Sequence, residues 1–177
     1  MKKCWKFAKA KAAKTGELYL YGPIASETWY GDEVTPKQFK DDLEALGDIE
    51  TLNIFLNSVG GDVWAGWAIH SMLARVQAQK NLYIDGIAAS IATVIAMAAD
   101  KIFMAKNALF MIHNAWTYTI GNAEDHRKAI ELLVRVDDVA RDLYAKKTGK
   151  DADEIRAMMD AETWLSADEA LAAGFAN

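Results

Sequence analysis

The order of the expected elements predicts an α/β domain with parallel strands. Short strand-like segments alternate with segments of helical periodicity along the whole chain. Such alternation favours parallel strand pairs joined by right-handed crossovers. The length of 177 residues fits one domain, and hydrophobic residues at 52% suffice for a core.

Three strands and two helices are expected in the first half of the chain. Residues 17–22 are rich in aromatic residues and end in glycine, which is typical of a strand followed by a turn. Thr35 and Pro36 have the order of an N-cap and a first helical residue, so a helix is expected over 36–46. Two further strands are expected at 52–56 and 82–84. Between them we expect a helix that contains Trp64, Trp67 and Met72, and after them a break at Gly86.

The second half is predicted to be mainly helical. Residues 123–147 combine an apolar stripe with a charged face and are followed by Gly149, which predicts a long amphipathic helix. Ser166 and Glu169 have capping-box spacing and mark the start of the last helix, which Gly174 ends. The other expected elements are a small-residue helix at 90–98, strands at 101–104 and 109–112, and a short helix at 151–159.

The net charge of −5 is unevenly distributed along the chain. Residues 1–16 contain six lysines and no acid, which leaves a net charge of −11 for the remainder. We therefore expect a flexible basic arm over 1–16 and one folded domain over 17–177; the alternative is an arm that binds a partner or nucleic acid. The acidic body argues against nucleic acid as the main ligand. The lysines of the arm are Lys2, Lys3, Lys6, Lys9, Lys11 and Lys14.

The sequence offers no sign of a metal site, a disulfide or a membrane segment. Cys4 is the single cysteine, and no Cys/His cluster has zinc-binding spacing, so we expect neither metal nor cofactor. No apolar segment follows the lysines as in a signal peptide, and the apolar run 86–99 is too short to cross a bilayer. We expect a cytoplasmic protein without membrane contacts.

A glycine pair follows the second main strand and precedes a helix. In the loop 57–62, Gly60 and Gly61 allow backbone N–H groups to face a ligand without a Cβ in the way. Such a turn can bind a phosphate or an oxyanion. The simpler interpretation is a tight strand–helix turn, and the loop matches no Walker A motif.

A serine and a histidine stand at the ends of expected elements. Ser90 begins a helix, where its hydroxyl and the Ile91 N–H lie at the positive end of the helix dipole. The alternative is a simple helix cap. His113 ends an apolar strand and is either a general base or a core histidine. Asp160 and Glu162 precede Trp164 and either orient that histidine or only cap a helix or face water.

Together these segments contain the four components of a serine hydrolase. Its chemistry needs a nucleophile, a base, a carboxylate that orients the base, and N–H donors for a tetrahedral oxyanion. The Gly-x-Ser-x-Gly elbow is absent, which disfavours the α/β-hydrolase fold.

Four segments in order resemble the signatures of the Clp protease proteolytic subunit family, over roughly residues 17–177. Within that family, the chain is most similar to the phage-encoded Clp-related head maturation proteases, on residues 18–22, 29–33 and 162–164. The four family segments are Asn-Ser-Val-Gly-Gly at 57–61, Gly-Ile-Ala-Ala-Ser at 86–90, Met-Ile-His at 111–113 and Trp-Leu-Ser-Ala-Asp-Glu-Ala at 164–170.

The resemblance implies a role for each candidate residue. Ser90 would be the nucleophile, His113 the general base, and the N–H groups of Gly61 and Ile91 the oxyanion hole. The family's aspartate falls in register with Glu162, and Asp160 is the alternative.

The resemblance also implies the fold that this family shares with the crotonases: repeated strand–strand–helix units and a projecting handle helix, here 123–147. It implies a homo-oligomeric serine endopeptidase without a cofactor that processes phage capsid or scaffold protein. The alternatives are general degradation with an ATPase partner, a crotonase-type acyl-CoA enzyme, and an inactive assembly subunit.

Two segments depart from the cellular members of the family. Val59 stands where they have proline, and residues 114–119 lack the Gln-Pro and glycine pair that follow their histidine. The resemblance therefore does not carry over a double heptameric barrel or docking to an ATP-driven unfoldase.

Overall fold

The computed structural model describes residues 7–9, 14–28 and 30–177. Most of the basic arm and Trp29 lie outside these ranges. Within the arm, the backbone of β1 (Phe7–Lys9) pairs antiparallel with β2 (Thr15–Tyr21), so residues 15 and 16 belong to a strand. The flexibility of the arm and the domain boundary at residue 17 stay predictions.

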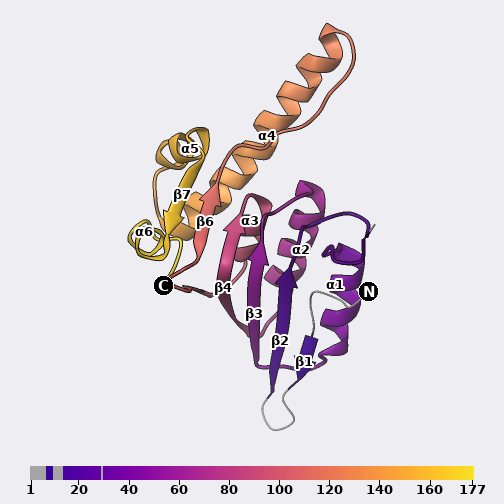
Figure 1. The fold of residues 1–177 in the computed structure, drawn as a ribbon, viewed down its shortest axis with the longest axis vertical. Helices are drawn as coiled ribbons and strands as arrows, with labels where there is room; N and C mark the ends of the chain where they lie inside the picture. Colours follow the sequence, from indigo (N-terminus) through magenta and orange to yellow (C-terminus); the bar gives the residue numbers. More distant parts are fainter. Residues whose placement is uncertain (1–6, 10–13, 29) are drawn as a thin grey trace.

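The described strands form one seven-stranded sheet in the order β1-β2-β3-β4-β6-β7, with β5 also beside β4 (Figure 1). Pairing is parallel from β2 through to β6, and it is antiparallel only for β1 and β7. This confirms the predicted α/β class with parallel strand pairs. The further strands are β3 (Thr51–Ser58), β4 (Gln79–Ala89), β5 (Lys101–Met104), β6 (Leu109–Ile112) and β7 (Thr163–Ser166).

The strand β4 is a fork in the sheet. Its first half, 81–84, pairs with β5, whereas its last residues, 87–89, pair with β6. The first half of β4 is therefore followed in the sheet by β5, and its last residues are followed by β6 and then β7.

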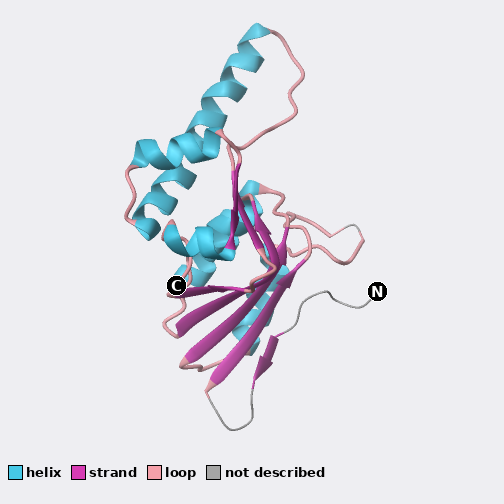
Figure 2. Cartoon of the chain, turned by 60° about the vertical axis from the view of Figure 1, so that its left-hand side comes forward, coloured by secondary structure: helices cyan, strands magenta, loops and turns pink. Residues whose placement is uncertain are grey.

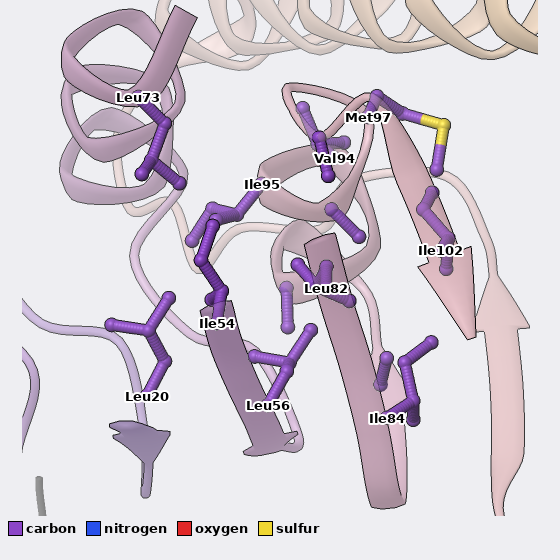
Figure 3. Close-up of a cluster of buried hydrophobic side chains, with 14 of the residues drawn as sticks. Leu20, Ile54, Leu56, Leu73, Leu82, Ile84, Val94, Ile95, Met97 and Ile102 are labelled. Carbon is purple, nitrogen blue, oxygen red and sulfur yellow. The ribbon is translucent and has the colours of Figure 1, made fainter. Parts of the chain in front are cut away.

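One face of the sheet is covered by α1 (Pro36–Ala45), α2 (Val63–Arg75) and α3 (Ile91–Ala96). Alternate residues of β2 and β3 are fully buried toward these helices, which is the period of a strand with one covered face. Figure 3 shows this core, where strand side chains meet those of α2, α3 and Met97. The labelled side chains are Leu20, Ile54, Leu56, Leu73, Leu82, Ile84, Val94, Ile95, Met97 and Ile102.

The opposite face carries an aromatic ladder, formed by Tyr19, Phe55, Tyr83 and Phe103 from four neighbouring strands. Successive rings stack with centroid distances of 4.6, 5.3 and 5.1 Å. These rings are half-buried, since no helix of the described chain packs over them. Stacked aromatic pairs stabilise the sheet by about 0.5–1.5 kcal/mol each beyond their burial.

The helix α4 (Ala123–Thr148) projects away from the sheet, and the segment after β6 runs out to its far end (Figures 1 and 2). A capping box of Asn122 and Asp125 starts it, and Gly149 ends it in the left-handed conformation at φ 74°. The shorter α5 (Ala152–Asp160) and α6 (Ala167–Ala172) follow. Within the ranges that the structure describes, no helix combines the length and apolar character needed to cross a bilayer.

One sequence prediction about the sheet was wrong, and one strand was not expected. Gly86 does not break the chain, because β4 runs through it to Ala89. The Asn57 side chain bonds the Ile87 N–H at 3.1 Å, and a Cβ on residue 86 would lie 2.7 Å from its oxygen. Glycine is needed there for a close approach rather than for a turn. Residues 163–166, for which no strand was expected, form the edge strand β7.

Candidate active site

Ser90 alone connects β4 to α3, and its backbone is strained. Its φ of 57° and ψ of −133° lie in a region that non-glycine residues rarely adopt. Such strain costs of the order of 1–3 kcal/mol and is held by the surroundings. The Ser90 N–H donates to the Met111 carbonyl at 3.0 Å, and the Ser90 carbonyl accepts from the Thr93 N–H at 2.9 Å.

The Ser90 side chain does not cap the helix that it precedes. It makes no hydrogen bond to the first turn of α3, so the helix-cap interpretation is wrong. Its Oγ instead lies 2.8 Å from Nε2 of His113.

The register of two strands brings this serine and histidine together. Ala89 of β4 pairs with Met111 of β6, and Ser90 and His113 each directly follow the last residue of their strand. The His113 side chain is only 17% exposed. When the Ser90 hydroxyl donates to Nε2, the remaining ring proton is on Nδ1, and the imidazole can accept the serine proton.

Glu162 faces the other ring nitrogen at a longer distance. Its Oε2 is 4.0 Å from Nδ1 of His113, beyond hydrogen-bond range, and its side chain is 58% exposed. The other oxygen, Oε1, accepts from the indole N–H of Trp164 at 3.3 Å. The antiparallel pairing of Thr163 with Ile112 brings Glu162 next to the histidine.

Asp160, the alternative acid, has a different partner. Its Oδ1 accepts from the side-chain amide of Asn114 at 2.7 Å. Of the two acids, Glu162 is the one whose carboxylate lies within 4.0 Å of a His113 ring nitrogen.

The glycine pair lies beside Ser90 and is constrained on both sides. Gly60 has φ 91° and Gly61 has φ 145°, and a Cβ on either would overlap a carbonyl oxygen, of Ala89 at 2.7 Å or of Ile24 at 2.0 Å. Neither position can therefore hold another residue without a shift of the backbone. The loop is more than a permissive strand–helix turn.

The direction of the Gly61 N–H follows from a parallel bridge to Ile24. The two bonds of this bridge use the Gly60 carbonyl and the Asp62 N–H, at 2.8 Å each. In a parallel pairing, the peptide groups of the bridged residue itself point to the other side. The Gly61 N–H thus points away from Ile24. The Ile91 N–H belongs to the first turn of α3, where helix N–H groups lack helical partners.

An outer cleft of about 550 Å³ opens at these residues. Gly61, Ser90 and His113 line it together with residues 115–118. Trp116 and Tyr118 in that segment are about four-fifths exposed, at 79% and 82%. The cleft is large enough for several residues of an extended peptide.

Two further features of the site were missed by the sequence analysis. Asp137 of α4 accepts the Ala115 N–H at 2.7 Å, and burial raises the pKa of its carboxyl group against the effect of that bond. The available signal was a charge three residues after Val134, within an otherwise apolar stripe. Buried Tyr144 lies 2.6 Å from the Thr93 hydroxyl, which donates to the Ser90 carbonyl at 2.5 Å. No local pattern signals this second contact.

Comparisons with known proteins cover nearly the whole chain. The family model described as Clp protease matches residues 13–177. An ATP-dependent Clp protease proteolytic subunit of Streptococcus gordonii is 33% identical over 137 residues, which are 75% of this chain and 70% of the relative. Proteins of the same name from Leuconostoc citreum and Streptococcus pneumoniae are 31% and 32% identical, over 75% of this chain and 68% and 70% of their own lengths.

Proposed function

This chain belongs to the Clp protease family and is a serine-type peptidase, and we propose that it cleaves peptide bonds through Ser90, His113 and Glu162. The observation that carries the proposal is the 2.8 Å contact between Ser90 Oγ and His113 Nε2. The strained backbone of Ser90 supports it, because strain of this kind is concentrated at functional sites.

The proposed reaction is acyl transfer in two steps. His113 Nε2 takes the Ser90 proton as Oγ attacks the peptide carbonyl carbon, and the carbonyl electron pair moves to oxygen. The N–H groups of Gly61 and Ile91 stabilise that oxyanion. The imidazolium returns its proton to the leaving amine, and the C–N bond breaks. Water then repeats the sequence and releases the carboxylate and free Ser90.

Glu162 would stabilise the imidazolium and keep the Nδ1 proton facing it. The 4.0 Å separation must shorten for a hydrogen bond, and a glutamate has three rotatable side-chain bonds for this movement. Catalytic hydrogen bonds are often long in unliganded sites and shorten with substrate.

A serine-reactive fluorophosphonate tests the nucleophile directly. We expect covalent labelling of Ser90 in the intact protein and none in Ser90→Ala, with the modified residue identified by peptide mass spectrometry. Failure to label Ser90 in a folded protein would favour a crotonase-type enzyme or an inactive assembly subunit.

The substrate that we propose is capsid or scaffold protein during phage head maturation. The support is the sequence resemblance of residues 18–22, 29–33 and 162–164 to that branch. Co-expression with the major capsid protein of such a phage should yield a shortened product of defined length, which Ser90→Ala should not produce.

The names of the relatives give a second candidate, because those proteins are called ATP-dependent. In that case the chain would degrade unfolded proteins with an ATPase partner. Casein digestion that needs such a partner and ATP, without processing of capsid protein, would favour this alternative.

We further propose a homo-oligomer in the cytoplasm. Large apolar side chains on α4 and on the segment before it face solvent in the single chain, among them Ile120 at 80% and Ile130 at 62% exposure. Exposed apolar surface of this kind marks contact sites. Size-exclusion chromatography with light scattering measures the subunit number.

A further inference from the structure

A second hollow, the inner hollow, adjoins the outer cleft and shares Val63, Ser90, His113 and Ala115 with it. It is bounded by α2, α3 and α4 and has a volume of about 30 Å³. Val63, Val94, Val136 and Ala140 supply apolar walls, and Ser90 and His113 also line the hollow. A single water-sized probe needs roughly 10–15 Å³ on this measure, so the space fits a side chain of two or three heavy atoms.

Asp137 places one carboxylate among these apolar walls. Its Oδ1 accepts the Ala115 N–H at 2.7 Å, and this is the one hydrogen bond that the structure gives its side chain within the described chain. The neighbouring cations are engaged elsewhere, because Arg141 and Arg156 both bond Asp138. A carboxylate has about four acceptor positions, so Asp137 retains capacity for a donor that enters the inner hollow.

We propose that the inner hollow receives the side chain of the residue whose carbonyl is attacked, and that Asp137 selects serine or threonine there. This inference rests on the proposed function of Ser90. A carbonyl carbon next to Ser90 Oγ with its oxygen toward the Ile91 N–H directs the adjacent side chain into the space that these two residues border.

Size and charge select the same class of residue. Serine and threonine have two and three side-chain heavy atoms, and their hydroxyl can donate to Asp137 while threonine's methyl contacts the valines. Leucine, phenylalanine and lysine are too long for the space. Aspartate is of suitable size but would bring a second carboxylate against the first, which is unfavourable.

The decisive substrates are a matched pair of peptides that differ only in threonine or valine before the scissile bond. The two side chains have the same shape, so the pair isolates the hydroxyl. We expect kcat/KM to be about 10–100-fold higher for threonine, as for a hydrogen bond to a charged group. Serine should exceed alanine in the same way, and leucine and lysine should be poor.

Asp137→Asn distinguishes two roles of this residue, selection of the substrate side chain and the hydrogen bond that holds Ala115 at the cleft. Its amide oxygen can still accept from Ala115, while an N–H₂ group replaces the free acceptor. We expect the ratio of kcat/KM for the threonine peptide to that for the valine peptide to fall toward 1, whatever the change in the absolute rates. Asp138→Asn on the same helix is the matched control and should leave the ratio unchanged. If Asp137 had a purely structural role, Asp137→Asn would lower kcat/KM for both peptides by the same factor.

Two results would overturn the inference: a wild-type ratio near or below 1, or an unchanged ratio in Asp137→Asn. If this variant does not fold, the wild-type ratio decides alone. To separate this from failure of the proposed function, the same pair of side chains is built into peptidyl phosphonates and the labelling rate of Ser90 is measured. Labelling without discrimination overturns the inference only, and absence of any labelling overturns the proposed function.

Discussion

The two halves of the site differ in how firmly the fold holds them. On the nucleophile half, Ser90 and His113 follow neighbouring parallel strands and are 2.8 Å apart. On the acid half, Glu162 precedes a four-residue edge strand, is 58% exposed and lies 4.0 Å from the histidine. Strands inside the sheet fix the contact between Ser90 and His113, whereas Glu162 at the edge of the sheet can still change its distance from His113.

Different forces account for the difference. Ser90 is held by backbone bonds to Met111 and Thr93, and by the buried hydroxyl contact between Thr93 and Tyr144. The Glu162 backbone N–H donates to the Met159 carbonyl at 3.0 Å, but the carboxylate accepts one long hydrogen bond, from the Trp164 indole at 3.3 Å. Buried, mutually bonded groups lose little further freedom on reaching a reactive geometry, whereas an exposed glutamate must still be ordered.

Ser90→Ala removes the nucleophile and should have the largest effect. We expect kcat to fall by about 10⁶-fold, because the imidazole then has no hydroxyl to activate. Peptide hydrolysis measures this, and a thermal melt confirms that the variant folds. Cleavage at the wild-type rate would refute the assignment.

Glu162→Gln tests the acid half against Asp160→Asn. We expect Glu162→Gln to reduce kcat by about 10²–10⁴-fold, since a neutral amide stabilises the imidazolium poorly. Asp160→Asn should have little effect, because Asp160 bonds Asn114. Steady-state kinetics of both variants decide the matter, and the opposite pattern would transfer the role to Asp160.

Gly61→Ala tests the rigidity of the nucleophile half. A Cβ there would lie 2.0 Å from the Ile24 carbonyl oxygen, so the loop must move and carry its N–H away. The expected loss in kcat is about 10²–10³-fold, as for removal of one oxyanion donor. Gly47→Ala is the control, because residue 47 also has positive φ but a Cβ there meets nothing within 4 Å. If kcat fell equally in both variants, the loss would be explained by strain of the backbone at positive φ and not by a displaced oxyanion donor.

Asp100→Asn should have the smallest effect. It should lower the free energy of unfolding slightly, because Asp100 bonds Lys80 of β4, the strand that Ser90 follows. The Lys80 N–H donates to the Asp100 carboxylate at 2.7 Å, and this bond lowers the pKa of Asp100. A lowered folded-state pKa stabilises the fold above the unfolded value of 3.8, and this stabilisation is lost as pH falls through the folded value.

Because Asp100 is half exposed, the loss at pH 7 should be under about 1 kcal/mol. Urea unfolding at pH 7 and at pH 3 should show the difference from wild type shrinking at the lower pH. A difference that grows on acidification would contradict this account.

Helices and strands that have a local sequence pattern could be predicted better than features that depend on contacts between distant residues. The stripes of α4 and the aromatic strand at 17–21 are local patterns, and the structure has both elements within two residues of their expected ends. The break predicted at Gly86 was wrong and β7 was not expected, because the approach of Asn57 to Ile87 and the pairing with β6 depend on residues distant in the sequence.

The site divides in the same way. Ser90, His113 and the glycine pair follow strand ends, and the resemblance to the Clp protease family implied that they act together. The 4.0 Å gap at Glu162 and the position of Asp137 beside Ser90 depend on the packing of α5 and α4, for which the sequence has no local signal.

The pairing of β6 with β7 has a consequence for chain length. It ties Ile112 to Thr163, so the whole excursion through α4 and α5 begins and ends at one ladder rung. Lengthening a closed loop costs little, about 0.6 kcal/mol for each doubling. The projecting helix can therefore gain or lose turns at its far end while His113 and Glu162 remain neighbours.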